Sequence, residues 1–266
     1  MRRAACFWSW FVGTALSWSV AAADAPRPSA AAIIERFLAR AKAAAEEEAR
    51  LEMTYRRTTV IEDLSSKDER QRRRIREHAV TNRAGVVRAR LVRIDDREPS
   101  DSEVASDARK EGDARKETTR RRRGPDFVDE ALVRQFDFTL EGEETVEGRR
   151  TFRLSYKAKP ERKGTDKNID RFLGLVGGKI WIDAEEFELA KVSAGLNEPL
   201  RILGGFAASI TRLEFDIIRK PVAPGCWCHV LLSSRAEGRR LFSGFNVRLE
   251  VEQGDFRVSP MTPASP

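Results

Sequence analysis

Hydrophobic positions near the start of the chain follow a helical period, which then gives way to a strand period. After Ser29, whose hydroxyl can cap a helix, one apolar stripe recurs at helical spacing: Ile33, Ile34, Phe37, Leu38 and Ala41. From Leu51 onward, apolar and polar residues alternate one by one. The pattern therefore predicts one amphipathic helix that ends near Glu48 and leads into a strand.

Period-two alternation continues through most of the remaining sequence. It predicts strands near 87–91, 136–140, 152–156, 180–182, 189–194, 213–217, 227–234 and 241–251. Short turns are expected at 147–148, 183–186 and 236–238. Many strands with short connections and one apolar face indicate a mainly β, α+β fold. We expect a curved antiparallel sheet or an incomplete β-barrel, covered by the N-terminal helix.

Two segments are too charged to contribute much to a core. Residues 64–76 are interpreted as a long turn or a strand extension. Residues 99–124 contain a duplication, Asp-Ala-Arg-Lys-Glu, beginning at Asp107 and at Asp113. This second segment has almost no apolar residues to offset the entropy of ordering it, so we expect a flexible insertion. A functional interpretation assigns peripheral membrane contact to its arginine run, Arg120, Arg121, Arg122 and Arg123.

The first 23 residues have the order of a secretory signal. Arg2 and Arg3 supply positive charge, an apolar run follows to Val20, and small residues fill 21–23 before Asp24. An N-terminal membrane anchor is the alternative, but it needs about 20 apolar residues. We therefore expect a signal peptide at 1–23, a single domain at 24–266 that contains the insertion at 99–124, and a periplasmic location.

Composition excludes several classes of protein. Of 266 residues, 41% are hydrophobic and 34% are charged, which argues against both a wholly disordered chain and a multi-span membrane protein. The net charge of +7 is a small excess among 49 basic and 42 acidic residues. Charges of both signs on that scale indicate a solvated surface, and together with export they argue against nucleic-acid binding.

The cysteines leave three interpretations open. Outside the signal, the chain has only Cys226 and Cys228, separated by Trp227. In a strand their Cα atoms would lie about 6.6 Å apart, at the edge of disulfide geometry. His229 would then point to the opposite face, and a tetrahedral metal site would lack a fourth ligand. Two ordinary strand cysteines are favoured over a strained disulfide, and metal or redox chemistry comes third.

No catalytic signature stands out in the sequence. His78 and His229 are the only histidines, and neither lies near a nucleophile motif, a zinc-protease motif or a phosphate-binding glycine loop. The adjacent acids Glu185 and Glu186 are interpreted as solvated turn residues. We expect a protein that is not an enzyme and that needs no cofactor and no metal.

One hairpin resembles a known superfamily. The stretch Gly178-Lys-Ile-Trp-Ile-Asp183, followed by Phe187-Glu-Leu-Ala-Lys-Val192, is similar to a hairpin of LolA-like periplasmic proteins, the outer-membrane lipoprotein-sorting superfamily. The order of signal, helix and strands, the Trp227 strand, the stretch at 238–242 and Phe256 resemble the same layout. The arginine-rich insertion and the Cys-Trp-Cys sequence depart from it.

The resemblance implies an incomplete barrel with an apolar cavity that accepts lipid or lipoprotein acyl chains. Period two selects the apolar side chains that would line this cavity or fill a core in its place: Phe136, Phe138, Phe152, Leu154, Ile180, Ile182 and Phe215. A carrier of acyl chains is the favoured function. The alternative is an envelope sensor of the same fold that binds a protein partner.

The signal assignment generates the first testable prediction. Cleavage between Ala23 and Asp24 is expected because small residues precede the cut and no proline follows it directly. The intact mass of protein from the exported fraction should correspond to a chain that starts at Asp24. Retention of Met1 in that fraction would contradict the prediction and favour an anchored protein.

Overall fold

The computed structural model describes residues 27–121, 130–160, 172–202, 208–241 and 243–261. The expected signal at 1–23 lies outside these residues, as do Arg122 and Arg123. The helices are α1 (Ala30–Glu48), α2 (Asp101–Arg121) and α3 (Glu130–Val133). The strands are β1 (Leu51–Leu64), β2 (Arg70–Arg83), β3 (Val86–Ile94), β4 (Phe136–Val146), β5 (Arg149–Ala158), β6 (Val176–Asp183), β7 (Leu189–Leu196), β8 (Leu200–Ile202), β9 (Ala208–Ala223), β10 (Cys226–Arg240) and β11 (Ser243–Pro260).

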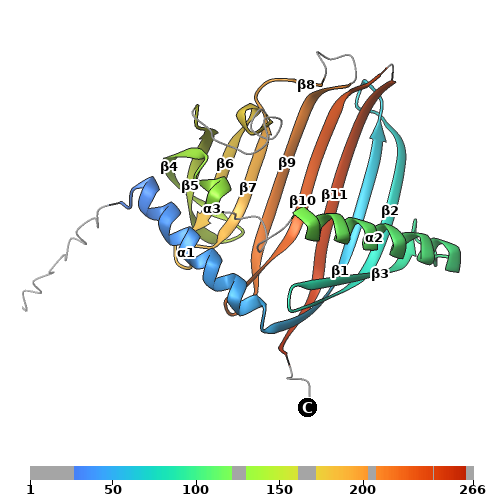
Figure 1. Ribbon diagram of the computed structural model, residues 1–266, viewed down its shortest axis with the longest axis horizontal. Helices are drawn as coiled ribbons and strands as arrows, with labels where there is room; N and C mark the ends of the chain where they lie inside the picture. Colours follow the sequence, from blue (N-terminus) through green and yellow to red (C-terminus); the bar gives the residue numbers. More distant parts are fainter. Residues whose placement is uncertain (1–26, 122–129, 161–171, 203–207, 242, 262–266) are drawn as a thin grey trace, which may run out of the picture.

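These strands form one curved antiparallel sheet that does not close. Its order is β3-β2-β1-β11-β10-β9-β7-β6-β5-β4, and β8 pairs with β9 beside this path. The first and last strands in sequence, β1 and β11, pair in the middle of the sheet (Figure 1). Since β3 and β4 are the two ends of the order, the fold is the open sheet that the alternation predicts.

Helix α1 builds the buried core on one side of the sheet. Ser29 accepts a hydrogen bond from the backbone N–H of Ala32, which begins the helix as predicted. Ile33 and Phe37 of its apolar stripe pack against strand residues of the second half of the chain. The buried cluster consists of Ile33, Ile34, Phe37, Phe152, Leu154, Ile180, Ile182 and Leu189.

Two details of the strand assignment differ from the sequence prediction. Residues 64–76, interpreted as a long turn or a strand extension, contain the end of β1, a short turn and the first half of a full strand, β2. The turn predicted at 236–238 is wrong, because β10 continues through it and ends at Arg240. Gly238 is there for close packing: a Cβ at this position would lie 2.1 Å from the Ser209 carbonyl oxygen on β9. The reversal follows at Leu241, which has a φ of 52°.

The segment 99–124 is helical over most of its length, as α2. The side chain of Asp107 is buried and its carboxylate lies 3.0 Å from Nε2 of His78 on β2. Glu111 forms an ion pair with Arg57 of β1 at 2.5 Å. The insertion is therefore attached to the sheet in its first half, which the sequence did not indicate. Its flexibility stays a prediction.

The core under α1 generates a stability prediction. Leu154 is fully buried in the cluster, so Leu154→Ala should lower the free energy of unfolding by about 2–5 kcal/mol through lost burial and a new cavity. Leu241→Ala is the matched control, since that leucine is 59% exposed and should change stability by less than about 0.5 kcal/mol. Urea unfolding of both variants measures the difference. Equal losses would show that Leu154 does not lie in a packed core.

Candidate ligand-binding site

Six apolar side chains lie close together in the middle of the sheet. Strand pairing aligns Phe215 of β9 with Ser234 of β10, and Ser234 with Leu249 of β11. Leu249 in turn aligns with Ile61 of β1. Two residues away on each strand, and therefore on the same face, Leu232 of β10 aligns with Val251 of β11. We name the following residues the central strip: Leu213, Phe215, Leu232, Leu249, Val251 and Ile61. Each of them is only half-buried.

Contacts of the strands at the two edges of the central strip, β9 and β1, show that the strip lies on the helix side of the sheet. Val192 of β7 aligns with Ile180, which packs in the cluster under α1, and also with Ile217 of β9. Arg57, which lies four residues before Ile61 on β1, contacts α2. Because side chains on a strand alternate between faces, Phe215 shares a face with Ile217 and Ile61 shares one with Arg57. Both α1 and α2 lie on this side of the sheet (Figure 1).

The opposite face of the same strands is mostly polar. Glu62 of β1 is the acid partner of Arg248 on β11 and of two β2 arginines, Arg70 and Arg73. Further toward β4, Lys179 pairs with Glu141 at 2.9 Å. The sheet therefore has one charged face and one apolar face, and the apolar face is the one that can hold a hydrophobic ligand.

The seven residues selected from the sequence lie on this same apolar face, in two environments. Phe152, Leu154, Ile180 and Ile182 are buried under α1, and Phe138 packs partly against them. Phe136 makes an edge contact with Tyr156, with ring centroids 5.3 Å apart. Phe215 belongs to the central strip. Their role in lipid binding stays a prediction.

The other five residues of the central strip are not among those selected from the sequence. Leu213, Leu249 and Val251 belong to predicted strands, but one sequence does not identify which strands are neighbours. The pairing of β1 with β11 spans almost the whole chain and brings Ile61 beside Leu249. The sequence signal that could have identified these five residues is the alternation of apolar and polar residues in their strands.

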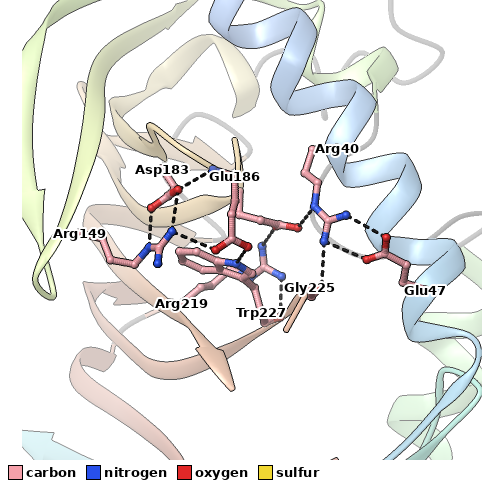
Figure 2. A network of polar contacts seen from close by, with 9 residues as sticks. Arg40, Glu47, Arg149, Asp183, Glu186, Arg219, Gly225 and Trp227 are labelled. Carbon is pink, nitrogen blue, oxygen red and sulfur yellow. Dashed lines mark hydrogen bonds and ion pairs between the residues drawn. The ribbon is translucent and has the colours of Figure 1, made fainter. Parts of the chain in front are cut away.

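A buried carboxylate fixes α1 beside the central strip. Glu188, which is 2% exposed, accepts a hydrogen bond from Nε of Arg40 on α1 at 2.8 Å. Its other oxygen accepts one from Arg219 of β9 at 3.3 Å. Arg40 also donates to the carbonyl of Gly225 and binds Glu47 of its own helix (Figure 2). Burial raises the pKa of Glu188 above its ordinary value, although both arginines act to lower it.

The network of polar contacts extends to the turn between β6 and β7, where Arg149 binds two carboxylates. Arg149 donates to Asp183 at 2.6 Å and to Glu186 at 2.9 Å. The indole N–H of Trp227 donates to Glu186 at 2.9 Å, and the Arg149 guanidinium lies 5.3 Å from the Trp227 ring (Figure 2). Glu186 is therefore a structural partner, which corrects its interpretation as a solvated turn residue.

Asp183 is held ionised by these contacts. Burial alone would raise its pKa, but hydrogen bonds from Arg149 and from the backbone N–H groups of Glu186 and Glu185 lower it below its ordinary value. The Asp183 carboxylate also organises the turn, because it accepts from both of those backbone groups.

A polar pocket of about 400 Å³ lies where α2 meets β2 and β3. Its basic lining residues are Arg72, Arg74, Arg76, Arg97 and Lys110, and its acidic ones are Asp95, Glu103 and Asp107. Arg74 aligns with Ile61 in the sheet, so the pocket lies next to the central strip. A cationic pocket beside an apolar surface suits a ligand with an anionic end.

Among the described residues, no three His, Cys, Asp or Glu side chains are grouped closely enough to hold a metal ion. The same residues contain no helix with the length and apolar character needed to cross a membrane.

No protein-family model and no curated protein matches the chain. Among solved structures, an outer-membrane lipoprotein-sorting protein domain from Vibrio parahaemolyticus is 11% identical with a TM-score of 0.32, over 86% of this chain and 95% of its own. A LolA superfamily protein from Nitrosomonas europaea is 10% identical with a TM-score of 0.28, over 89% and 96%. A chain of the MucA/MucB complex of Pseudomonas aeruginosa is 11% identical with a TM-score of 0.23, over 85% and 99%. The first two belong to the superfamily that the hairpin at 178–192 resembles, but likeness at these TM-scores carries no functional information.

The lowered pKa of Asp183 generates a pH prediction. Because the folded pKa lies below the unfolded value of about 3.9, the ionised carboxylate stabilises the fold above that pH and loses this effect as the pH falls through the folded pKa. Asp183→Asn should therefore lower the free energy of unfolding at neutral pH, and its deficit should shrink on acidification below about pH 4. Asp137→Asn, at an exposed position of β4, is the control and should have little effect. A deficit that does not change with pH would contradict the prediction.

Proposed function

We propose that the protein is a periplasmic carrier or binding protein that holds the acyl chains of a lipid or lipoprotein on the helix side of its sheet. The observation that carries this proposal is the central strip: apolar side chains of four neighbouring strands, half-buried on one face, while the other face of the sheet is mostly charged. Covering such a surface with hydrocarbon is favourable by about 0.8 kcal/mol per buried CH₂ group.

Hydrocarbon fits the central strip better than an extended peptide does. β9, β10, β11 and β1 are interior strands, so their backbone N–H and C=O groups are paired with neighbours on both sides. A peptide added as a strand needs an open edge, and the sheet order leaves those at β3 and β4. A ligand on the central strip contacts side chains alone, and those side chains are aliphatic or aromatic.

The surroundings of the central strip suit an amphiphile with an anionic head. Ile61 aligns with Arg74 of β2, and the next helix-side pair is Thr59 with Arg76. Both arginines line the cationic pocket under α2. An acyl chain on the central strip would therefore place a carboxylate or phosphate group near these two guanidinium groups, which are paired with Asp63 and Asp107 and would bind the anion through their remaining N–H groups. Membrane contact through Arg120, Arg121, Arg122 and Arg123 would bring the protein to its lipid source.

The second function to separate from this one is a sensor that binds a protein partner. An amphipathic helix of a partner could lie on the central strip in place of an acyl chain. Organic-solvent extraction of the purified protein, followed by mass spectrometry, distinguishes the two. Bound lipid supports the carrier, and a stable protein complex without lipid supports the sensor.

Adjacent leucines of β10 provide the functional test. Leu232 belongs to the central strip, whereas Leu231 points to the opposite face of the same strand. Leu232→Asp would place a charge under the bound hydrocarbon and should weaken binding of a fluorescent fatty acid by about tenfold or more, equivalent to about 1.4 kcal/mol. Leu231→Asp should leave the affinity nearly unchanged.

Equal losses in both variants, with both still folded by circular dichroism, would contradict binding on the central strip. Phe138→Ala extends the test to the surface under α1. Loss of fatty-acid affinity with little loss of stability would show that the ligand reaches that region, as expected for the residues selected from the sequence. A large loss of stability, with no fatty-acid binding by the parent protein, would exclude the carrier.

A further inference from the structure

Three sulfur atoms meet where β10 begins. The thiol of Cys228 lies 3.3 Å from Sδ of Met53 on β1. Cys226 lies two residues before Cys228 on the same strand, and the interaction between the two thiols lowers the pKa of Cys226 and raises that of Cys228. The two cysteines are free thiols. Two thiols and one thioether, from parts of the chain 175 residues apart, therefore form one cluster.

Local irregularity of β10 allows this cluster to form. The register with β9 shifts between Cys226 and Trp227 and again between His229 and Leu231. Such bulges bend a strand and redirect its side chains, so the distances of a regular strand do not apply here. The first β10 residue paired with β11 is Leu231, and the strand before it is free to approach Met53.

The cluster is enclosed but can be reached from one side. Cys226 is 5% exposed and Met53 is 3% exposed, whereas Cys228 is only half-buried. Asn82, the neighbour of Met53 on β2, donates a hydrogen bond to Glu48 at the end of α1 at 3.0 Å, and its own Oδ1 is buried without a hydrogen-bond partner. An unpartnered amide oxygen therefore lies on the residue that is aligned with Met53 in the sheet.

We propose that Cys226, Cys228 and Met53 form a binding site for Cu(I). Thiolate and thioether sulfur are soft ligands, and this combination selects Cu(I) among the biological metals. Zn²⁺ takes four tetrahedral ligands, and the described residues contain no group of three His, Cys, Asp or Glu from which to build such a set. Binding would release the thiol protons, because the thiolate is the ligand.

This inference departs from the expectation that no metal is bound. The expectation was based on Cys226, Cys228 and His229, which do not complete the four ligands of a tetrahedral metal site. Met53, 173 residues before Cys226 in the sequence, supplies the third soft ligand only in the folded chain. The site is independent of the central strip, so its failure would leave the proposed lipid-binding function untouched.

Competition for Cu(I) tests the proposal. Fully reduced, metal-free protein is titrated without oxygen against bicinchoninate, a coloured Cu(I) chelator. The wild-type chain should withdraw one equivalent of Cu(I) and show the ultraviolet absorbance of sulfur-to-copper charge transfer. Cys226→Ser and Cys228→Ser should abolish both signals, and Met53→Leu should weaken retention while preserving side-chain volume. Met261→Leu, at a methionine outside the cluster, should behave as wild type.

Two results would overturn the site. One is failure of the reduced wild-type chain to compete for Cu(I), which would show ordinary packing or thiols that are unavailable. The other is equal Cu(I) retention by wild type and Met53→Leu, which would exclude the thioether as a ligand. Unfolding curves of each variant identify those that fold, and the Met53→Leu comparison keeps the test valid if a cysteine variant does not. A parallel titration should show much weaker retention of Zn²⁺.

Discussion

The structure depends on the need to cover one face of a wide, unclosed sheet. Alternating strands place charged residues on one side and apolar residues on the other, and the sheet never curls far enough to bring β3 to β4. Helix α1 packs on strand residues from β5 to β7, and α2 contacts β1, β2 and β3. The central strip lies on the strands between β7 and β2, and α2 passes in front of part of these strands in the view of Figure 1.

Glu188 shows how the position of α1 is fixed at the boundary of the central strip. Its carboxylate binds Arg40 of the helix and Arg219 of β9, and Arg40 continues to the β9–β10 turn at Gly225. Ion pairs this deep offer little net stability, because desolvation costs about as much as the attraction gains. Removing one partner, however, leaves a buried charge. The arrangement therefore favours one position of the helix over others, and this helix borders the proposed ligand surface.

The sequence predicted individual helices and strands better than it predicted which strands pair with each other. The N-terminal helix, its Ser29 cap and most strands followed from local periodicity, which depends on residues two to four apart. Strand β2 was missed because its arginines hide the buried positions of His78, Val80 and Asn82. The turn expected at Ala236–Gly238 was wrong because Gly238 allows close strand packing. Contacts over long sequence distances, such as Ile61 beside Leu249, were beyond a single sequence.

The same limit separates the two proposed sites from the residues selected at the outset. Phe152, Leu154, Ile180 and Ile182 belong to strands that follow one another in the chain, so their shared face could be inferred from turns and alternation. The central strip joins β1 to β11, and the sulfur cluster joins β1 to the irregular start of β10. Each proposed site combines residues of β1 with residues of β10 or β11. Both sites arise because β1 lies in the interior of the sheet, beside β11. That pairing, which no local pattern encodes, brings together the residues of both proposed sites.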